Sequence, residues 1–264
     1  MKFIIAGYGF VGKAVKAALK YTYETEVVDP ALTEVKISDH YDAAGIIICV
    51  NTPSDDNGDC DISNVLDVIS QTPVHMPILI KSTVSPDKLK AITEKYSEHS
   101  IAYSPEFLRA KSAIEDFAKQ KYMIIGGDDP LDFWHCAFRG AMPNLLVVHK
   151  CSIEEAAIIK YATNSFLAMK VSFFNHIYDI CEASGHDFDI VRHLICQDNR
   201  IGTSHSMVPG PDGERGWGGH CFPKDTSAFI HYINSLDQKF DLLETVIEYN
   251  KKVKKGVDTS VNIS

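Results

Sequence analysis

The first 150 residues alternate short apolar runs with stretches of helical character, and this alternation strongly limits how the chain can fold. The apolar runs are rich in β-branched residues and cover residues 2–7, 25–29, 44–50, 77–83, 101–105, 122–127 and 144–149. Helical stretches lie near residues 10–20, 62–70, 86–97 and 130–139. Near-continuous apolar strands separated by helices are typical of a parallel sheet covered on both faces. We therefore expect an α/β, Rossmann-like, doubly wound domain over residues 1–150.

A long helix is expected next, because residues 152–184 contain neither proline nor glycine and their apolar residues recur at helical spacing. Ser152 and Glu155 form a capping box at its start, and Gly185 is a natural stop. About 33 residues at a rise of 1.5 Å span about 50 Å. A helix of that length outruns one small core, so we expect part of its apolar face to pack on a second copy of the chain, as a homodimer.

A helix over residues 189–196, a polar loop over residues 197–222 and two closing helices complete the expected helical domain, residues 151–264. No apolar run approaches the roughly 18 residues of a membrane span, and the first residues do not resemble a secretion signal. We therefore expect a cytoplasmic protein.

Charge and cysteine content exclude several classes of partner. The 35 acidic residues outnumber the 26 basic ones, and the net charge of −9 disfavours nucleic acid and anionic membranes. The chain has seven cysteines but no CxxC pair, which favours reduced thiols and predicts no metal site. Cys49, Cys181 and Cys196 lie in apolar runs and are expected in the core, whereas Cys221 does not.

The N-terminal glycines predict a dinucleotide site. Gly7, Gly9 and Gly12 form GxGxxG directly after an expected strand and at the start of an expected helix. In this context the glycines allow a tight turn, close approach of a pyrophosphate, and close packing of helix on strand. Asp29 ends the next expected strand at the offset typical of an acid that binds a ribose 2′-hydroxyl, which favours NAD over NADP.

The segment GWGGHCFPKD points to a reactive thiol at Cys221. Two glycines leave the backbone bare before it, Lys224 brings positive charge that favours thiolate, and Asp225 follows four residues later. Pro223 suits the first turn of a helix, which would set the thiol near the helix's positive end.

Four further polar residues are candidates for the same site. Lys160 and Asn164 are one helical turn apart in a mostly apolar stretch, where they would stabilise an oxyanion. A snorkelling lysine and a tolerated asparagine are the plainer alternative. Thr83 and Glu106 follow expected strands, at the sheet edge where α/β proteins bind ligands. For each residue taken alone, a hydroxyl cap and a solvated carboxylate are the more common explanations.

Taken together, the sequence resembles the nucleotide-sugar dehydrogenase family of UDP-glucose and GDP-mannose dehydrogenases. The resemblance runs through GYGFVG, VNTPSDD, KSTV, SPEFLR, KYATNSFLAMKVSFFN, DNRIG and GGHCFPKD, in the family's order and over essentially the whole chain. It implies oxidation of the C6 alcohol of UDP-glucose to the carboxylate of UDP-glucuronate, by two hydride transfers to NAD.

The resemblance also implies roles for individual residues. Cys221 would trap the intermediate aldehyde, Lys160 and Asn164 would steady its oxyanion, and Glu106 would handle protons beside a water held by Thr83 and Asp225. The implied NAD-binding residues are Gly7, Gly9, Phe10, Val11, Gly12, Asp29, Thr52, Pro53 and Thr83. The implied substrate-binding residues are Glu106, Phe107, Leu108, Arg109, Lys160, Asn164, Gly218, Lys224 and, from a neighbouring subunit, Arg200.

Three features depart from the family pattern. Ala110 stands where a second glutamate often follows the EFLR stretch, and the loop over residues 203–219 is longer than usual. Family members continue after the last expected helix into a third, nucleotide-binding domain, which we expect to be absent here, either as a natural minimal form or because the sequence is a fragment.

Other interpretations stay open. GDP-mannose or another nucleotide sugar is an alternative substrate, because the third domain reads part of the nucleotide. A single hydride transfer without a thiol, as in β-hydroxyacid dehydrogenases, is a second alternative. A non-catalytic family member that kept the fold is a third.

Overall fold

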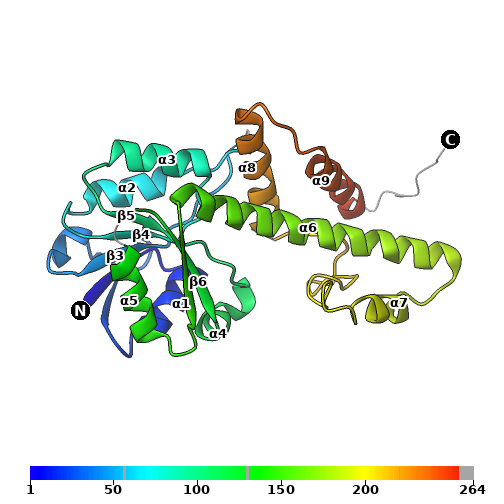
Figure 1. Ribbon diagram of the computed structural model, residues 1–264, viewed down its shortest axis with the longest axis horizontal. Helices are drawn as coiled ribbons and strands as arrows, with labels where there is room; N and C mark the ends of the chain where they lie inside the picture. Colours follow the sequence, from blue (N-terminus) through cyan, green and yellow to red (C-terminus); the bar gives the residue numbers. More distant parts are fainter. Residues whose placement is uncertain (56–57, 129–130, 220, 256–264) are drawn as a thin grey trace. The chain divides into compact units, whose positions relative to one another are not determined.

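Figure 1 shows a computed structural model of the chain, which describes residues 1–55, 58–128, 131–219 and 221–255. The chain divides into two compact units, Met1–Lys160 and Tyr161–Ser264. The division falls inside the long helix α6 (Ile153–Ser184). Positions 130 and 220, in a predicted helix and the predicted loop, lie outside the described residues.

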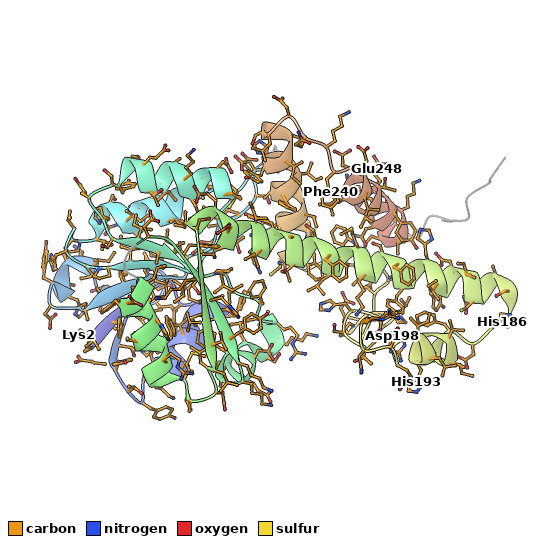
Figure 2. All side chains as sticks on the ribbon, in the orientation of Figure 1. Lys2, His186, His193, Asp198, Phe240 and Glu248 are labelled. Carbon is orange, nitrogen blue, oxygen red and sulfur yellow. The ribbon has the colours of Figure 1, made fainter. Side chains whose placement is uncertain are left out.

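The first unit is built on a seven-stranded sheet in the order β2-β1-β3-β4-β5-β6-β7. Lys2, labelled in Figure 2, is the first residue of β1. The strands are β1 (Lys2–Ala6), β2 (Glu24–Val28), β3 (Gly45–Ile48), β4 (Ile78–Ile80), β5 (Ile101–Tyr103), β6 (Tyr122–Gly126) and β7 (Val147–Cys151). All seven overlap the apolar runs of the sequence, which confirms the α/β, Rossmann-like class.

The last two strands run in a direction that the sequence pattern did not predict. The strands from β2 to β5 are mutually parallel, but β6 pairs antiparallel with β5 through Tyr103 and Gly126, and β7 is parallel to β6. A parallel crossover must carry the chain back along the sheet, usually through a helix. The β5–β6 connection holds only a 3-10 turn, η2 (Ala110–Ser112), and the six-residue helix α4 (Ala113–Ala118), which was not predicted.

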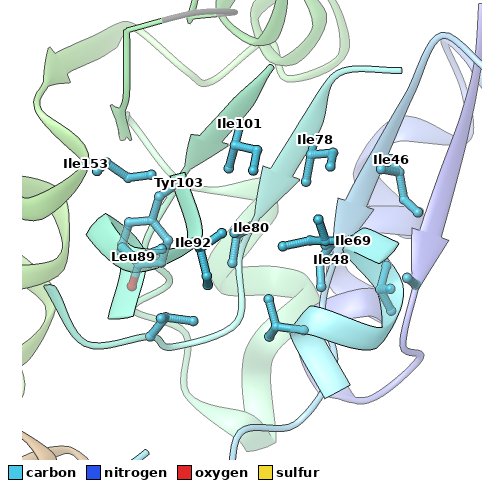
Figure 3. Close-up of a cluster of buried hydrophobic side chains, with 14 of the residues drawn as sticks. Ile46, Ile48, Ile69, Ile78, Ile80, Leu89, Ile92, Ile101, Tyr103 and Ile153 are labelled. Carbon is cyan, nitrogen blue, oxygen red and sulfur yellow. The ribbon is translucent and has the colours of Figure 1, made fainter. Parts of the chain in front are cut away.

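Helices cover both faces of this sheet because alternate strand residues point to opposite sides. Ile46 and Ile48 pack in one apolar cluster with α2 (Ser63–Gln71), α3 (Pro86–Lys95) and the start of α6, as Figure 3 shows. Ile47 packs in the other cluster with α1 (Phe10–Leu19), α4 and α5 (Leu131–Ala141). A 3-10 helix, η1 (Ile37–His40), precedes β3. The strands β3, β4 and β5 are buried along their whole length, which explains their uninterrupted apolar sequence.

The second unit is helical. The capping box at the start of α6 is confirmed, since Ser152 N donates to Glu155 Oε2 at 2.7 Å and Glu155 N donates to Ser152 Oγ at 3.2 Å. The helix stops before Gly185, whose φ of 71° suits glycine. The helix α7 (Phe188–Ile195) follows, capped by the side chain of Asp187.

Two helices close the described chain, α8 (Cys221–Ser235) and α9 (Asp241–Lys254). The helix α8 begins with the cysteine itself, so Pro223, expected near the first position, is its third residue and lies in the first turn. Proline fits there because N–H groups of the first turn have no partner within the helix. Among the described residues, no helix is long and apolar enough to cross a membrane.

Candidate active site

The glycine turn between β1 and α1 has the shape that a dinucleotide requires. Gly7 has a φ of 89°, and a Cβ there would lie 2.8 Å from backbone atoms of Cys49. A Cβ on Gly12 would lie 2.1 Å from the carbonyl oxygen of Gly7. A Cβ on Gly9 would meet nothing within 4 Å, so open space lies over the N-terminus of α1. This space, beside the positive end of a helix, fits a pyrophosphate.

Asp29 lies beside the turn, as its predicted role requires. Its Oδ2 accepts from Tyr8 N at 2.7 Å, and its Oδ1 accepts from Ala31 N at 3.0 Å. The carboxylate of Asp29, the residue directly after β2, therefore fixes the turn. Phe10 and Val11 form the first residues of α1.

The loops after β3 and β4 are joined by a hydrogen bond from Thr52 Oγ1 to the carbonyl oxygen of Thr83, at 2.8 Å. Pro53 is exposed next to Thr52, and Thr83 is half-buried. The structure thus brings Thr83 to the segment Thr52–Pro53, some 30 positions earlier in the chain, and all three are predicted cofactor-binding residues. They lie at the carboxyl ends of parallel strands, where α/β folds bind ligands.

Glu106 is held by two lysines. Lys81, which the sequence analysis did not single out, places Nζ 3.0 Å from Glu106 Oε2, and both side chains are almost fully buried. Lys160 Nζ donates to the backbone carbonyl of Glu106. The second carboxylate oxygen, Oε1, accepts from Phe107 N at 3.0 Å. The position of this lysine, directly after the apolar strand Ile78–Ile80, is the sequence signal that could have identified a buried cation.

The residues after Glu106 turn toward the surface. The ammonium of Lys160 lies over the ring of Phe107, with Nζ 5.3 Å from the ring centroid. Leu108 packs on the α1 face of the sheet. Arg109 is exposed and pairs with Asp116 at 2.6 Å, and its guanidinium holds the pKa of that carboxyl well below the usual range. The predicted substrate contact of Arg109 stays a prediction.

In the second unit, the buried Asp225 joins two predicted site residues. Its Oδ2 accepts from Asn164 Nδ2 at 2.5 Å, and its Oδ1 accepts from Lys224 Nζ at 2.6 Å. Cys221 lies one helical turn before Asp225 in α8 and is half-buried. The ammonium of Lys224 is therefore directed at the carboxylate, and its predicted effect on the thiol stays a prediction.

The remaining predicted substrate residues lie in the loop between α7 and α8. Arg200 is exposed and pairs with Asp198 at 2.5 Å; Asp198 is labelled in Figure 2. Gly218 is half-buried, three residues before Cys221. Cys49, Cys181 and Cys196 are buried, as expected. Over the described part of the chain, no group of three or more His, Cys, Asp or Glu side chains is placed to hold a metal ion.

Comparison with known proteins identifies both units. Residues 24–133 match the NAD binding domain of the UDP-glucose/GDP-mannose dehydrogenase family, and residues 154–252 match its central domain. The chain is 35% identical over 218 residues to UDP-glucose 6-dehydrogenase YwqF of Bacillus subtilis, which covers 78% of this chain and 48% of that protein. The chain spans about half the length of the curated relatives that it matches.

Solved structures agree with this match. A UDP-glucose dehydrogenase from the archaeon Pyrobaculum islandicum superposes with a TM-score of 0.82 at 25% identity, covering 95% of this chain and 68% of that one. A GDP-mannose dehydrogenase from Pseudomonas aeruginosa superposes with a TM-score of 0.68 at 24% identity, covering 96% and 69%. At that lower identity, the second likeness shows the fold alone.

Proposed function

The chain belongs to the UDP-glucose/GDP-mannose dehydrogenase family, with NAD as its cofactor, and we propose that it oxidises the C6 alcohol of UDP-glucose to a carboxylate. The observation that carries this proposal is the start of α8, where Cys221 precedes a buried Asp225 that is bonded to Asn164. A simple one-hydride dehydrogenase needs no thiol at this position.

NAD supplies the hydride acceptor for both oxidation steps. Gly7, Gly9 and Gly12 would admit its pyrophosphate, and Asp29 would accept from a ribose hydroxyl. Thr52, Pro53 and Thr83, at the strand ends, would contact the rest of the cofactor.

Cys221 would form a bond from its sulfur to the C6 aldehyde left by the first hydride transfer, giving a thiohemiacetal. Lys160 and Asn164 would stabilise the oxygen that becomes negative in this step. The C6 hydrogen would leave as the second hydride, leaving a thioester on Cys221. Water would then attack the thioester carbon, releasing the carboxylate and the thiol.

Hydrolysis of the thioester would use three polar residues. Glu106 would accept a proton from the attacking water, and Thr83 and Asp225 would orient that water. The balanced reaction consumes one alcohol, one water and two oxidised cofactors, and it releases one carboxylate, two reduced cofactors and three protons. Lys224, Gly218 and the segment Phe107–Arg109 would contact the nucleotide sugar.

The test is to incubate the purified chain with NAD and a panel of UDP- and GDP-sugars while the absorbance of NADH is followed. UDP-glucose should yield two NADH per sugar, and a single NADH would favour the one-hydride alternative. A GDP-mannose preference would reassign the substrate. Cys221→Ala should abolish uronate formation and leave NAD affinity unchanged, with Cys136→Ala, an exposed cysteine, as the matched control. Normal turnover of Cys221→Ala would refute the covalent route.

We also propose that the protein forms a homodimer through α6. Phe166, Phe173 and Ile180 recur every seven residues along that helix and are 62%, 53% and 60% exposed. Seven residues are about two helical turns, so these side chains form one apolar stripe suited to a second helix. Arg200, whose side chain is 89% exposed, would reach the partner's substrate.

Light scattering after gel filtration tests the dimer. Phe173→Asp should halve the measured mass by placing a charge in the apolar stripe, whereas Glu182→Ala, on an exposed position of the same helix, should not. An unchanged mass for both variants would rule out this interface. A cytoplasmic location is also part of the proposal, supported by seven cysteines that are all free.

A further inference from the structure

The segment Arg215–Trp217, shortly before Cys221, is held by side chains of α6 and α9. It lies in the long loop that departs from the family pattern. Trp217 is buried although it belongs to a loop rich in glycine. None of its partners was singled out from the sequence.

Asn250, a buried residue of α9, binds both backbone groups of Trp217. Trp217 N donates to Asn250 Oδ1 at 2.7 Å, and Asn250 Nδ2 donates to the carbonyl oxygen of Trp217 at 2.8 Å. Two bonds from one amide fix the direction of the chain at that residue. Gly216 allows this approach, because its φ is 73° and a Cβ there would lie 2.5 Å from Asn250 Oδ1.

The indole of Trp217 makes two further contacts. Its Nε1 donates to Ser172 Oγ of α6 at 2.9 Å. Its ring lies edge-on to Phe222, with 6.5 Å between the centroids. Trp217 therefore precedes Cys221 in the chain and also contacts Phe222, the residue directly after it.

The residues before Trp217 are bonded to α6. Gly216 N donates to Asn175 Oδ1 at 3.1 Å. Arg215 donates to Asp179 at 2.5 Å and lies over the ring of Tyr178 at 4.9 Å. We call Arg215–Trp217 with its partners Asn250, Ser172, Asn175 and Asp179 the loop clamp.

We propose that the loop clamp positions Cys221, and that Asn250 is its central positioning residue. The inference rests on the proposed function, since it gives the clamp a role in thiol chemistry. Because glycine restricts the chain little, Gly218 and Gly219, which lie between the clamp and Cys221, do not themselves fix the position of the thiol. The fixed point just before them, with its ring contact to Phe222, therefore sets where the thiol lies. A clamp that served stability alone would leave thiol reactivity unchanged in a variant that still folds.

The test compares Asn250→Ala with Asn234→Ala, an exposed asparagine of α8. The alkylation rate of each thiol by iodoacetamide is followed by peptide mass spectrometry, with the exposed Cys136 as the internal reference. Loss of two buried hydrogen bonds should raise the Cys221 rate about tenfold relative to Cys136. It should also lower kcat about tenfold at unchanged NAD affinity. Asn234→Ala should match wild type in both measurements.

If Asn250→Ala fails to fold, Ser172→Ala provides the test, because it removes only one hydroxyl. It should raise the Cys221 alkylation rate and lower kcat, each about threefold. Folded variants with wild-type alkylation rates and kcat would overturn the clamp. If wild-type protein oxidises no nucleotide sugar, the proposed function fails, and the alkylation ratio still decides whether the clamp positions the thiol.

Discussion

Replacing Lys81 with methionine removes the cation from a buried ion pair and strands the carboxylate of Glu106. The lysine side chain is 0% exposed and the glutamate side chain 6%, with 3.0 Å between Nζ and Oε2. The ammonium also donates to Ser104 Oγ at 3.2 Å and lies 5.4 Å from the ring centroid of Phe117. Methionine fills a similar volume without the charge, so the change tests the electrostatic part of the interaction.

Two opposing energies set the size of the effect. The attraction of unit charges 3.0 Å apart is about 5.5 kcal/mol at an effective dielectric constant of about 20. Removal of both charges from water costs several kcal/mol per ion, so the intact pair contributes little net stability. Loss of one partner leaves the desolvation cost of the other uncompensated, which costs about 3–5 kcal/mol. At about 2–4 °C per kcal/mol, Lys81→Met should lower the melting temperature by about 6–20 °C.

Thermal unfolding followed by circular dichroism measures this effect in the full chain. The double variant Lys81→Met with Glu106→Leu should recover most of the lost stability, because neither charge then remains buried. Lys2→Met is the matched control: it breaks the surface pair with Asp42, where solvent screens the charges, and should shift the melting temperature by only a few degrees. A double variant that loses the sum of the two single losses would refute the ion-pair reasoning.

Three further predictions follow from local geometry. Gly9→Ala should fold normally but lose at least about tenfold in NAD affinity by calorimetry, because its Cβ enters the space over α1; Gly12→Ala should instead fold poorly, since its Cβ meets the Gly7 carbonyl at 2.1 Å. Ser152→Ala should lower the melting temperature by about 2–4 °C at pH 7. The backbone N–H of Ser152, and after it the hydroxyl, lower the pKa of Glu155 below 4.5. Alanine keeps the N–H and removes the hydroxyl, so the variant lacks only the hydroxyl's share of a stabilisation that is present above that value, and the difference from wild type should shrink as pH falls below it. Burial raises the pKa of Cys49 to about 12, so iodoacetamide at pH 8 should label Cys136 and spare Cys49 until the protein is denatured, as peptide mass spectrometry would show. A glycine or serine variant that behaves like wild type would contradict its prediction. Labelling of Cys49 in the folded protein at the rate of Cys136 would contradict the last one.

Features that depend on neighbouring residues could be predicted from the order of amino acids. The strand runs, the glycine turn after β1, the capping box of Ser152 and the stop at Gly185 all arise from periodicity or backbone preference within a few positions. The strength of these signals explains why the bounds of α6 agree with the prediction to within one residue. The six-residue helix α4 was missed because so short a segment has almost no periodicity.

Contacts between distant segments depended on the path of the folded chain. The antiparallel direction of β6 arises because the β5–β6 connection does not carry the chain back along the sheet, and strand composition does not encode that direction. Asn164 meets Asp225 across 61 positions, and Trp217 meets Asn250 across 33. Lys81 shows the same limit: its burial follows from its strand, but its partner Glu106 is known only once β4 and β5 lie side by side. A buried polar group requires a partner, but local sequence does not say which residue the fold will bring to it.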